Sequence, residues 1–112
     1  MTRNRSTKII FSVFSGYEVR VIVARDIERT GRRLKEDLSN TDAAYIVKDD
    51  VAGIGWMVLQ PTADPKLIAH EAHHAICALA SFVGTTFDEE TFAHHHGYLV
   101  GRIHKFLKRG NG

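Results

Sequence analysis

The segment 65–82 is the longest stretch with one apolar face, and it constrains the fold more than any other part of the chain. Asp64 can cap the start of a helix there, Pro65 suits the first helical position, and Gly84 suits the residue after the end. Apolar side chains recur at the spacing of one helical face: Ile68, Ala72, Ile76, Leu79 and Val83. We therefore expect a helix that buries this face.

The remaining segments predict both strands and helices. Runs rich in β-branched and aromatic residues predict strands over 8–14, 18–24, 43–47 and 53–60. Asp26 can cap a helix over 26–38, and acidic residues from 88 followed by basic residues to 109 suit the two ends of a final helix. The order is β-β-α-β-β-α-α. It predicts an α+β domain with a mixed or antiparallel four-stranded sheet and three helices.

Composition places the chain among ordinary globular domains. Its 112 residues fit one domain over 1–112, with 44% hydrophobic and 25% charged residues. We expect 1–6 and 109–112 to be flexible. No apolar run is long enough to cross a bilayer, and no signal peptide is recognisable, so we expect no membrane partner. Cys77 is the single cysteine, which excludes an internal disulfide framework and favours the cytoplasm; its expected role is a small apolar filler.

The histidines point to the site of chemistry, because all seven lie within 70–104. His70, Glu71 and His74 form the pattern H-E-x-x-H inside the predicted helix. Residues four apart on a helix lie about 40° apart on one face, so two imidazoles can bind one Zn²⁺. The adjacent glutamate can then act as the general base towards water. The pattern therefore predicts His70 and His74 as metal ligands and Glu71 as a catalytic residue.

A catalytic zinc normally has three protein ligands and one open position. On the predicted final helix, Glu90, His94, Gly97 and Gly101 share one line, and the glycines would let a second helix approach closely. This line predicts Glu90 as the third ligand, with Glu89 and His94 as the alternatives.

The run of three histidines at 94–96 fans over about 200° of a helix, so the three cannot share one metal. His94 lies on the line of the proposed ligand. We therefore expect it to act in catalysis by hydrogen-bonding the oxyanion of a tetrahedral intermediate. Tyr98 and His73 are further candidates for that role. The other two histidines of the run are expected to be ordinary polar or interface residues.

Three stretches resemble a known family: LIAHEAHHA at 67–75, DEETFAH at 88–94 and GYLVG at 97–101. They are similar to the small zincin-like metallopeptidases of tailed bacteriophages and prophages, which carry I-A-H-E-x-x-H-A on one helix and D-E-x-x-A-Y-x-x-G-Y on the next. The resemblance covers roughly the C-terminal half. It implies a gluzincin ligand set of His70, His74 and Glu90 for Zn²⁺, and a phage- or prophage-encoded protein of the bacterial host's cytoplasm.

The resemblance also implies a substrate-binding edge. In zincins the strand at the sheet edge above the cleft pairs with an extended peptide, and here that strand would be 53–60. The chain departs from the family pattern at two positions: His94 replaces a tyrosine, and His73 replaces an apolar residue. Both departures change the polarity of the site without removing a ligand.

Three functional readings follow. The leading one is a zinc-dependent hydrolase, most simply a metallopeptidase acting on a peptide or protein. The alternative is a zinc-stabilised, non-catalytic protein-binding module of phage origin, in which Glu71 has no chemical role. A third is nucleic-acid binding through Arg3, Arg5, Arg29, Arg32 and Arg33, but a net charge of +2 argues against nucleic acid as a partner. The sequence leaves the oligomeric state open.

Overall fold

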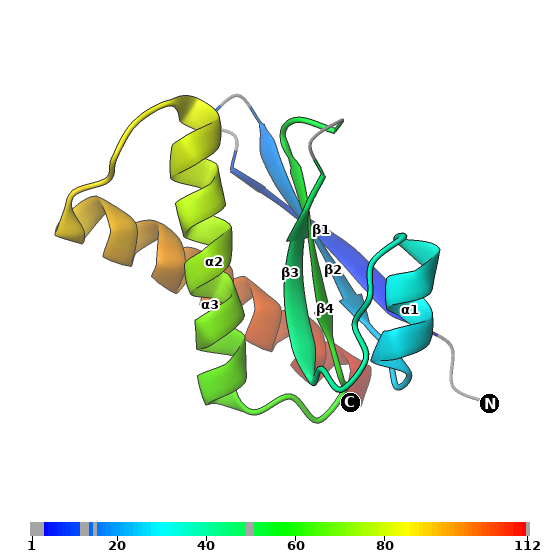
Figure 1. Ribbon diagram of the computed structural model, residues 1–112. Helices are drawn as coiled ribbons and strands as arrows, with labels where there is room; N and C mark the ends of the chain where they lie inside the picture. The colour runs from blue at the N-terminus through cyan, green and yellow to red at the C-terminus, as the bar shows by residue number, and fades with distance from the viewer. Residues whose placement is uncertain (1–3, 12–13, 15, 49–50, 112) are drawn as a thin grey trace.

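The computed structural model describes residues 4–11, 14, 16–48 and 51–111, and side chains as far as Arg109. Over these residues the chain forms a small α+β domain in three layers, with one helix on one side of a sheet and two on the other (Figure 1). The elements are β1 (Arg5–Phe11), β2 (Tyr17–Val23), α1 (Ile27–Arg33), β3 (Ala43–Val47), β4 (Ile54–Leu59), α2 (Pro65–Val83) and α3 (Glu89–Asn111). The predicted class and element order are confirmed.

The four-stranded sheet is mixed, with the order β1-β2-β4-β3. β1 pairs with β2 and β3 with β4 in antiparallel fashion, whereas β2 and β4 run parallel. β4 therefore lies inside the sheet, and the expectation that the strand 53–60 forms an edge is wrong. The edges are β1 and β3. After β2 the chain passes through α1 and β3, and β4 then pairs with β2 on one side and with β3 on the other.

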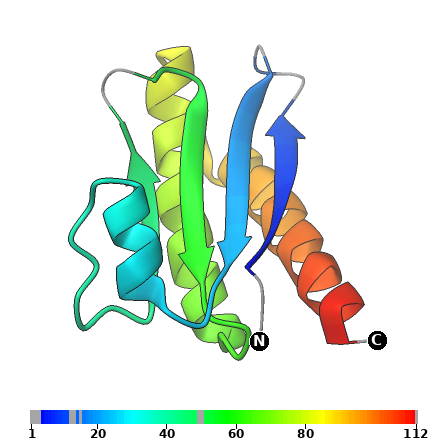
Figure 2. The same ribbon diagram turned by 90° about the vertical axis from the view of Figure 1, so that its right-hand side faces the viewer.

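Each face of the sheet has its own core. α2 and α3 cover the face that carries Val19, Val21 and Met57, all fully buried. α1 covers part of the other face through Ile27, which joins a smaller cluster with Val58. Figure 2 shows α1 in front of the sheet, with α2 and α3 behind it. No helix in the described part of the chain is both long and apolar enough to cross a bilayer.

α2 forms as the sequence predicts. The Asp64 carboxylate accepts a hydrogen bond from the Leu67 N–H at 3.0 Å, and Pro65 occupies the first turn. Gly84 ends the helix in the left-handed conformation, at φ 74°, which glycine adopts without steric cost. These local signals position the helix that carries His70 and His74.

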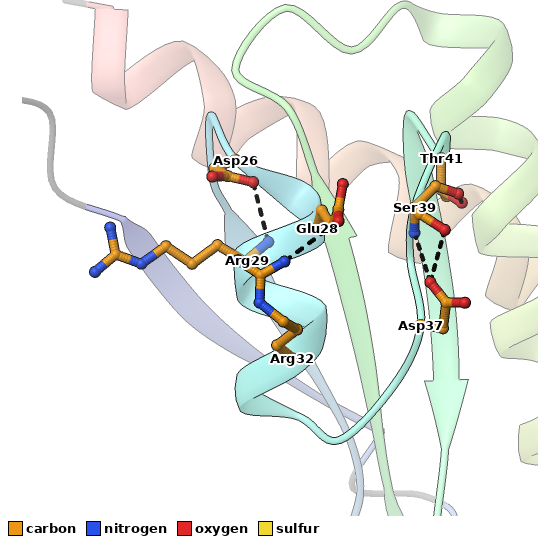
Figure 3. Close-up of polar contacts among 7 residues, drawn as sticks. All are labelled: Asp26, Glu28, Arg29, Arg32, Asp37, Ser39 and Thr41. Carbon is orange, nitrogen blue, oxygen red and sulfur yellow. Dashed lines mark hydrogen bonds and ion pairs between the residues drawn. The ribbon is translucent and has the colours of Figure 1, made fainter.

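α1 is shorter than expected. Asp26 caps it, accepting a hydrogen bond from the Arg29 N–H at 3.0 Å (Figure 3). The helix ends at Arg33, and Lys35 adopts a left-handed conformation with φ 61°. The prediction that the helix extends to Leu38 is therefore wrong.

Leu38 nevertheless reaches the core. After the chain turns back, its side chain packs on Gly31, where an added Cβ would lie 2.7 Å from Leu38 Cγ. The Asp37 carboxylate accepts hydrogen bonds from both the N–H and the hydroxyl of Ser39 (Figure 3). Such local bonds compete with helix formation. Leu38 is therefore buried, although it lies outside the helix that the sequence predicted to include it.

Smaller differences occur at the ends of other elements. β1 spans Arg5–Phe11 and begins earlier than the predicted start at 8, whereas residues 12–13 of the predicted strand lie outside the described residues. α3 continues to Asn111, beyond the predicted end at 109. The flexibility expected for 1–6 and 109–112 stays a prediction. The sequence Lys48-Asp49-Asp50 also predicts a turn between the two strands on either side, and this stays a prediction because residues 49–50 lie outside the described residues.

A pair of tyrosines bridges β2 and β3 across Gly55. The hydroxyls of Tyr17 and Tyr45 lie 2.7 Å apart, and burial raises the pKa of both. A Cβ added at Gly55 would lie 1.7 Å from the Tyr45 hydroxyl, so only glycine leaves room for this hydrogen bond.

We expect Gly55→Ala to lower the free energy of unfolding by about 1–3 kcal/mol, because the tyrosine pair must move. Gly97→Ala is the matched control. Its added Cβ meets open space on an exposed helix, so this change should raise stability by about 1 kcal/mol. Chemical denaturation of both variants provides the test. Unchanged stability of Gly55→Ala would contradict the packing described.

Candidate metal centre

His70 and His74 lie on the exposed side of α2. The opposite side of the helix carries Ala72, Ile76 and Leu79, which are fully buried against the sheet. The two Nε2 atoms lie 3.2 Å apart, and the rings are nearly perpendicular, at 80°, with centroids 4.8 Å apart. The four-residue spacing thus brings two imidazole nitrogens to one point in contact with solvent.

This separation fits two ligands of one zinc ion. Zn–N bonds of about 2.0–2.1 Å at a tetrahedral angle place two ligand nitrogens roughly 3.3 Å apart. The observed 3.2 Å agrees with that value. In the absence of metal, one ring can donate its Nε2–H to the other, which holds the pair at the same separation. The separation of the two Nε2 atoms is therefore compatible with two ligands of one metal ion.

Glu71 is a largely buried acidic residue. Only 7% of the residue is exposed. The ion pairs among the described residues all lie elsewhere: Arg20–Glu18, Arg32–Glu28 and Lys48–Glu36. No fully buried side-chain oxygen in this part of the chain lacks a hydrogen-bond partner. Glu71 directly follows His70 on α2, so its backbone position is next to the histidine pair.

The described residues do not bring a third ligand to this pair. They contain no group of three or more His, Cys, Asp or Glu side chains close enough to hold a metal ion. Glu90 and His94 are exposed, and a Cβ added at Gly97 or Gly101 would meet nothing within 4 Å. The expectation that a second helix approaches this line of α3 is wrong, because the line faces open space.

α3 meets α2 through a different face. Figure 1 shows α3 crossing α2. The contact is made by Phe92, whose ring centroid lies 4.9 Å from that of His73. Because residues three apart share a helical side, Glu89 lies on the side of Phe92, whereas Glu90 points away from it. The larger apolar side chains determine the packed face, and the glycines stay outside it.

His96, which the sequence predicted only as a polar or interface residue, lies between α3 and α2. Its Nε2–H donates to the carbonyl oxygen of Ala69 at 3.0 Å, and its ring stacks near Phe92 at an interplanar angle of 19°. It therefore ties α3 to the residue directly before His70. The helical spacing of the sequence could have predicted this position, since His96 lies on the same face of α3 as Phe92 and the buried Leu99.

Two of the three candidates for oxyanion stabilisation, His94 and Tyr98, contact other residues, whereas the ring of the third, His73, lies 6.3 Å from that of His74. His94 is exposed, with its ring 5.2 Å from that of His95. Burial among aromatic side chains, including Phe14 at 4.8 Å, lowers the pKa of His95, and the neighbouring His94 lowers it further. The Tyr98 hydroxyl donates to the carbonyl oxygen of Ile10 on β1 at 3.3 Å.

Cys77 and His73 extend the exposed row on α2. The Cys77 sulfur lies 3.8 Å from His73 Nδ1, and both residues are exposed. The expectation that Cys77 fills an apolar gap is therefore wrong. The reason is its position one helical repeat beyond His70, on the side that faces water.

In comparisons with known proteins, no family model, no curated protein and no solved structure matches this chain.

Proposed function

We propose that the protein is a zinc-dependent hydrolase, most simply a metallopeptidase, with His70 and His74 as metal ligands and Glu71 as the general base. The 3.2 Å separation of the two Nε2 atoms carries the proposal, because it fits two ligands of one tetrahedral zinc. The resemblance of the motif to phage and prophage zincins agrees with it and suggests a protein of the bacterial host's cytoplasm.

A bound zinc ion would polarise a substrate carbonyl and lower the pKa of water. The chain's own contribution is to move the proton. Glu71 directly follows His70 on α2, and only 7% of it is exposed, which restricts the positions open to its carboxylate. It accepts a proton from the attacking water and returns that proton to the leaving amine.

An extended peptide would bind along the sheet edge nearest α2. That edge is β3, which packs against α2. β3 pairs with β4 along one edge, and among the described residues no strand pairs with its other edge. Its last residue, Val47, is 52% exposed. Edge strands bind peptides through their free backbone groups, so β3 takes the role that the sequence assigned to 53–60.

Two neighbouring glutamates, Glu89 and Glu90, are candidates for the third zinc ligand, and their variants distinguish them. The resemblance assigns Glu90, whereas the face of α3 that meets α2 favours Glu89. We expect Glu89→Gln to weaken zinc binding at least about tenfold, because a carboxylate ligand would be lost. Glu90→Gln should change the affinity less than about twofold, and competition with a chromophoric chelator measures both. The reverse pattern would make Glu90 the ligand.

Metal removal tests the proposed activity. The protein is incubated with a diverse peptide mixture, and cleavage is followed by mass spectrometry. We expect cleavage by the zinc-loaded protein, none after chelation, and recovery when zinc is restored but not when magnesium is added. Zinc binding without any cleavage would contradict the proposal and favour the zinc-stabilised binding module.

A further inference from the structure

A basic groove lies between β1 and the C-terminal half of α3, remote in sequence from the histidine motif. The two elements run side by side at one edge of the domain (Figure 2). The groove is lined by Thr7, Ile9, Arg102, Lys105, Phe106 and Arg109. Arg5 belongs to the same surface: its guanidinium donates to the Phe106 carbonyl oxygen at 3.4 Å and lies 4.8 Å from the centre of the Phe106 ring.

Among the described residues, the lining of this groove contains no acidic side chain. No Asp or Glu occurs in residues 1–17 or 91–112, so neither β1 nor the part of α3 that follows Glu90 contains one. Arg102, Lys105 and Arg109 are exposed, and none of them takes part in an ion pair among the described residues. The net charge of the whole chain is only +2, but the side chains that β1 and this part of α3 contribute to the groove surface are basic or neutral, because the acidic residues lie in other segments.

The arrangement of the cations favours a regular polyanion. Arg102, Lys105 and Arg109 follow one another at intervals of three and four residues, so they form a row about 10 Å long on one side of α3. A nucleic-acid strand presents a comparable row, with one phosphate per about 3.4 Å of duplex axis. Arginine pairs with phosphate in a bidentate manner, and the Thr7 hydroxyl offers a further donor.

We propose that the basic groove binds the sugar-phosphate backbone of a nucleic acid. Of the arginines that the sequence suggested for nucleic-acid binding, Arg5 borders this groove, whereas Arg29, Arg32 and Arg33 belong to α1. Arg32 on α1 already pairs with Glu28 at 3.3 Å, and α1 lies on the other face of the sheet. Binding at the groove does not depend on zinc or on the histidine pair.

The test compares two variants with the same change of charge. The groove variant combines Arg102→Glu, Lys105→Glu and Arg109→Glu. The control variant makes the same change on α1, with Arg29→Glu, Arg32→Glu and Arg33→Glu. All six side chains are exposed, and thermal melting followed by circular dichroism checks that both variants fold. Fluorescence anisotropy then measures binding to short labelled oligonucleotides: single-stranded DNA, duplex DNA and single-stranded RNA.

We expect the wild-type protein to bind at least one of these oligonucleotides at about 50 mM salt and to lose affinity steeply by about 200 mM. The groove variant should bind at least about tenfold more weakly, with the salt slope reduced by about 2–3. The control variant should stay within about twofold of the wild type. Three results would overturn the proposal: no binding at the lower salt, equal losses in both variants, or equally effective competition by polyglutamate.

Discussion

Glutamine in place of Glu71 should lower the rate of peptide hydrolysis by about 10²–10⁴-fold, which is the usual contribution of a positioned general base. The amide cannot accept the proton, but it has nearly the same shape and should keep the packing of a side chain that is only 7% exposed. Neither proposed imidazole ligand is altered, so zinc content and the melting temperature should stay close to those of the wild type.

Rates from the peptide-mixture assay, together with zinc analysis of the same preparations, test this expectation. Glu28→Gln is the matched control, because it makes the same chemical change at an exposed position on α1 and should leave the rate unaltered. A Glu71→Gln protein that cleaves peptides at the wild-type rate would remove Glu71 from the mechanism.

His70→Ala should abolish the stabilisation of the protein by zinc. For a site that binds metal only in the folded state, zinc at one hundred times its Kd adds about 2.7 kcal/mol to the free energy of unfolding. With one of the two converging imidazoles removed, that gain should disappear. The metal-free variant should be nearly as stable as the metal-free wild type, because His70 is exposed.

Thermal unfolding with and without zinc measures this effect, and His73→Ala provides a control on the same helix. His73 is also exposed, but its Nδ1 lies near the Cys77 sulfur and its ring packs on Phe92, so it is not one of the two converging imidazoles. Its replacement should preserve the zinc-dependent shift. If His73→Ala loses the shift and His70→Ala keeps it, the metal is bound by a different set of side chains.

The features that the sequence predicted correctly depend on local interactions. The start of α2 follows from the Asp64 carboxylate and Pro65, and its end from the left-handed Gly84. The convergence of His70 and His74 follows in the same way from their spacing on that helix. Each of these outcomes is determined within a few residues, so no knowledge of the rest of the fold was needed.

The features that the sequence missed depend on contacts between distant segments. β4 became an internal strand because it pairs with β2 in parallel, and no local pattern specifies that partner. The packed face of α3 was decided by Phe92 and His96 meeting α2, which left Glu90 on the outer side. The argument that a second helix packs on the Glu90 line was wrong for this reason, and the third ligand stays a prediction. The convergence of His70 and His74 did not depend on that packing, because both lie on one helix.

X-ray absorption at the zinc edge, on protein purified without added metal, tests the central proposal most directly. We expect about one zinc per chain, with two imidazole nitrogens at about 2.0–2.1 Å, and loss of this signal in His70→Ala. Protein that lacks stoichiometric zinc, or zinc whose ligand shell contains no imidazole, would contradict the proposed metal centre and the hydrolase activity that depends on it.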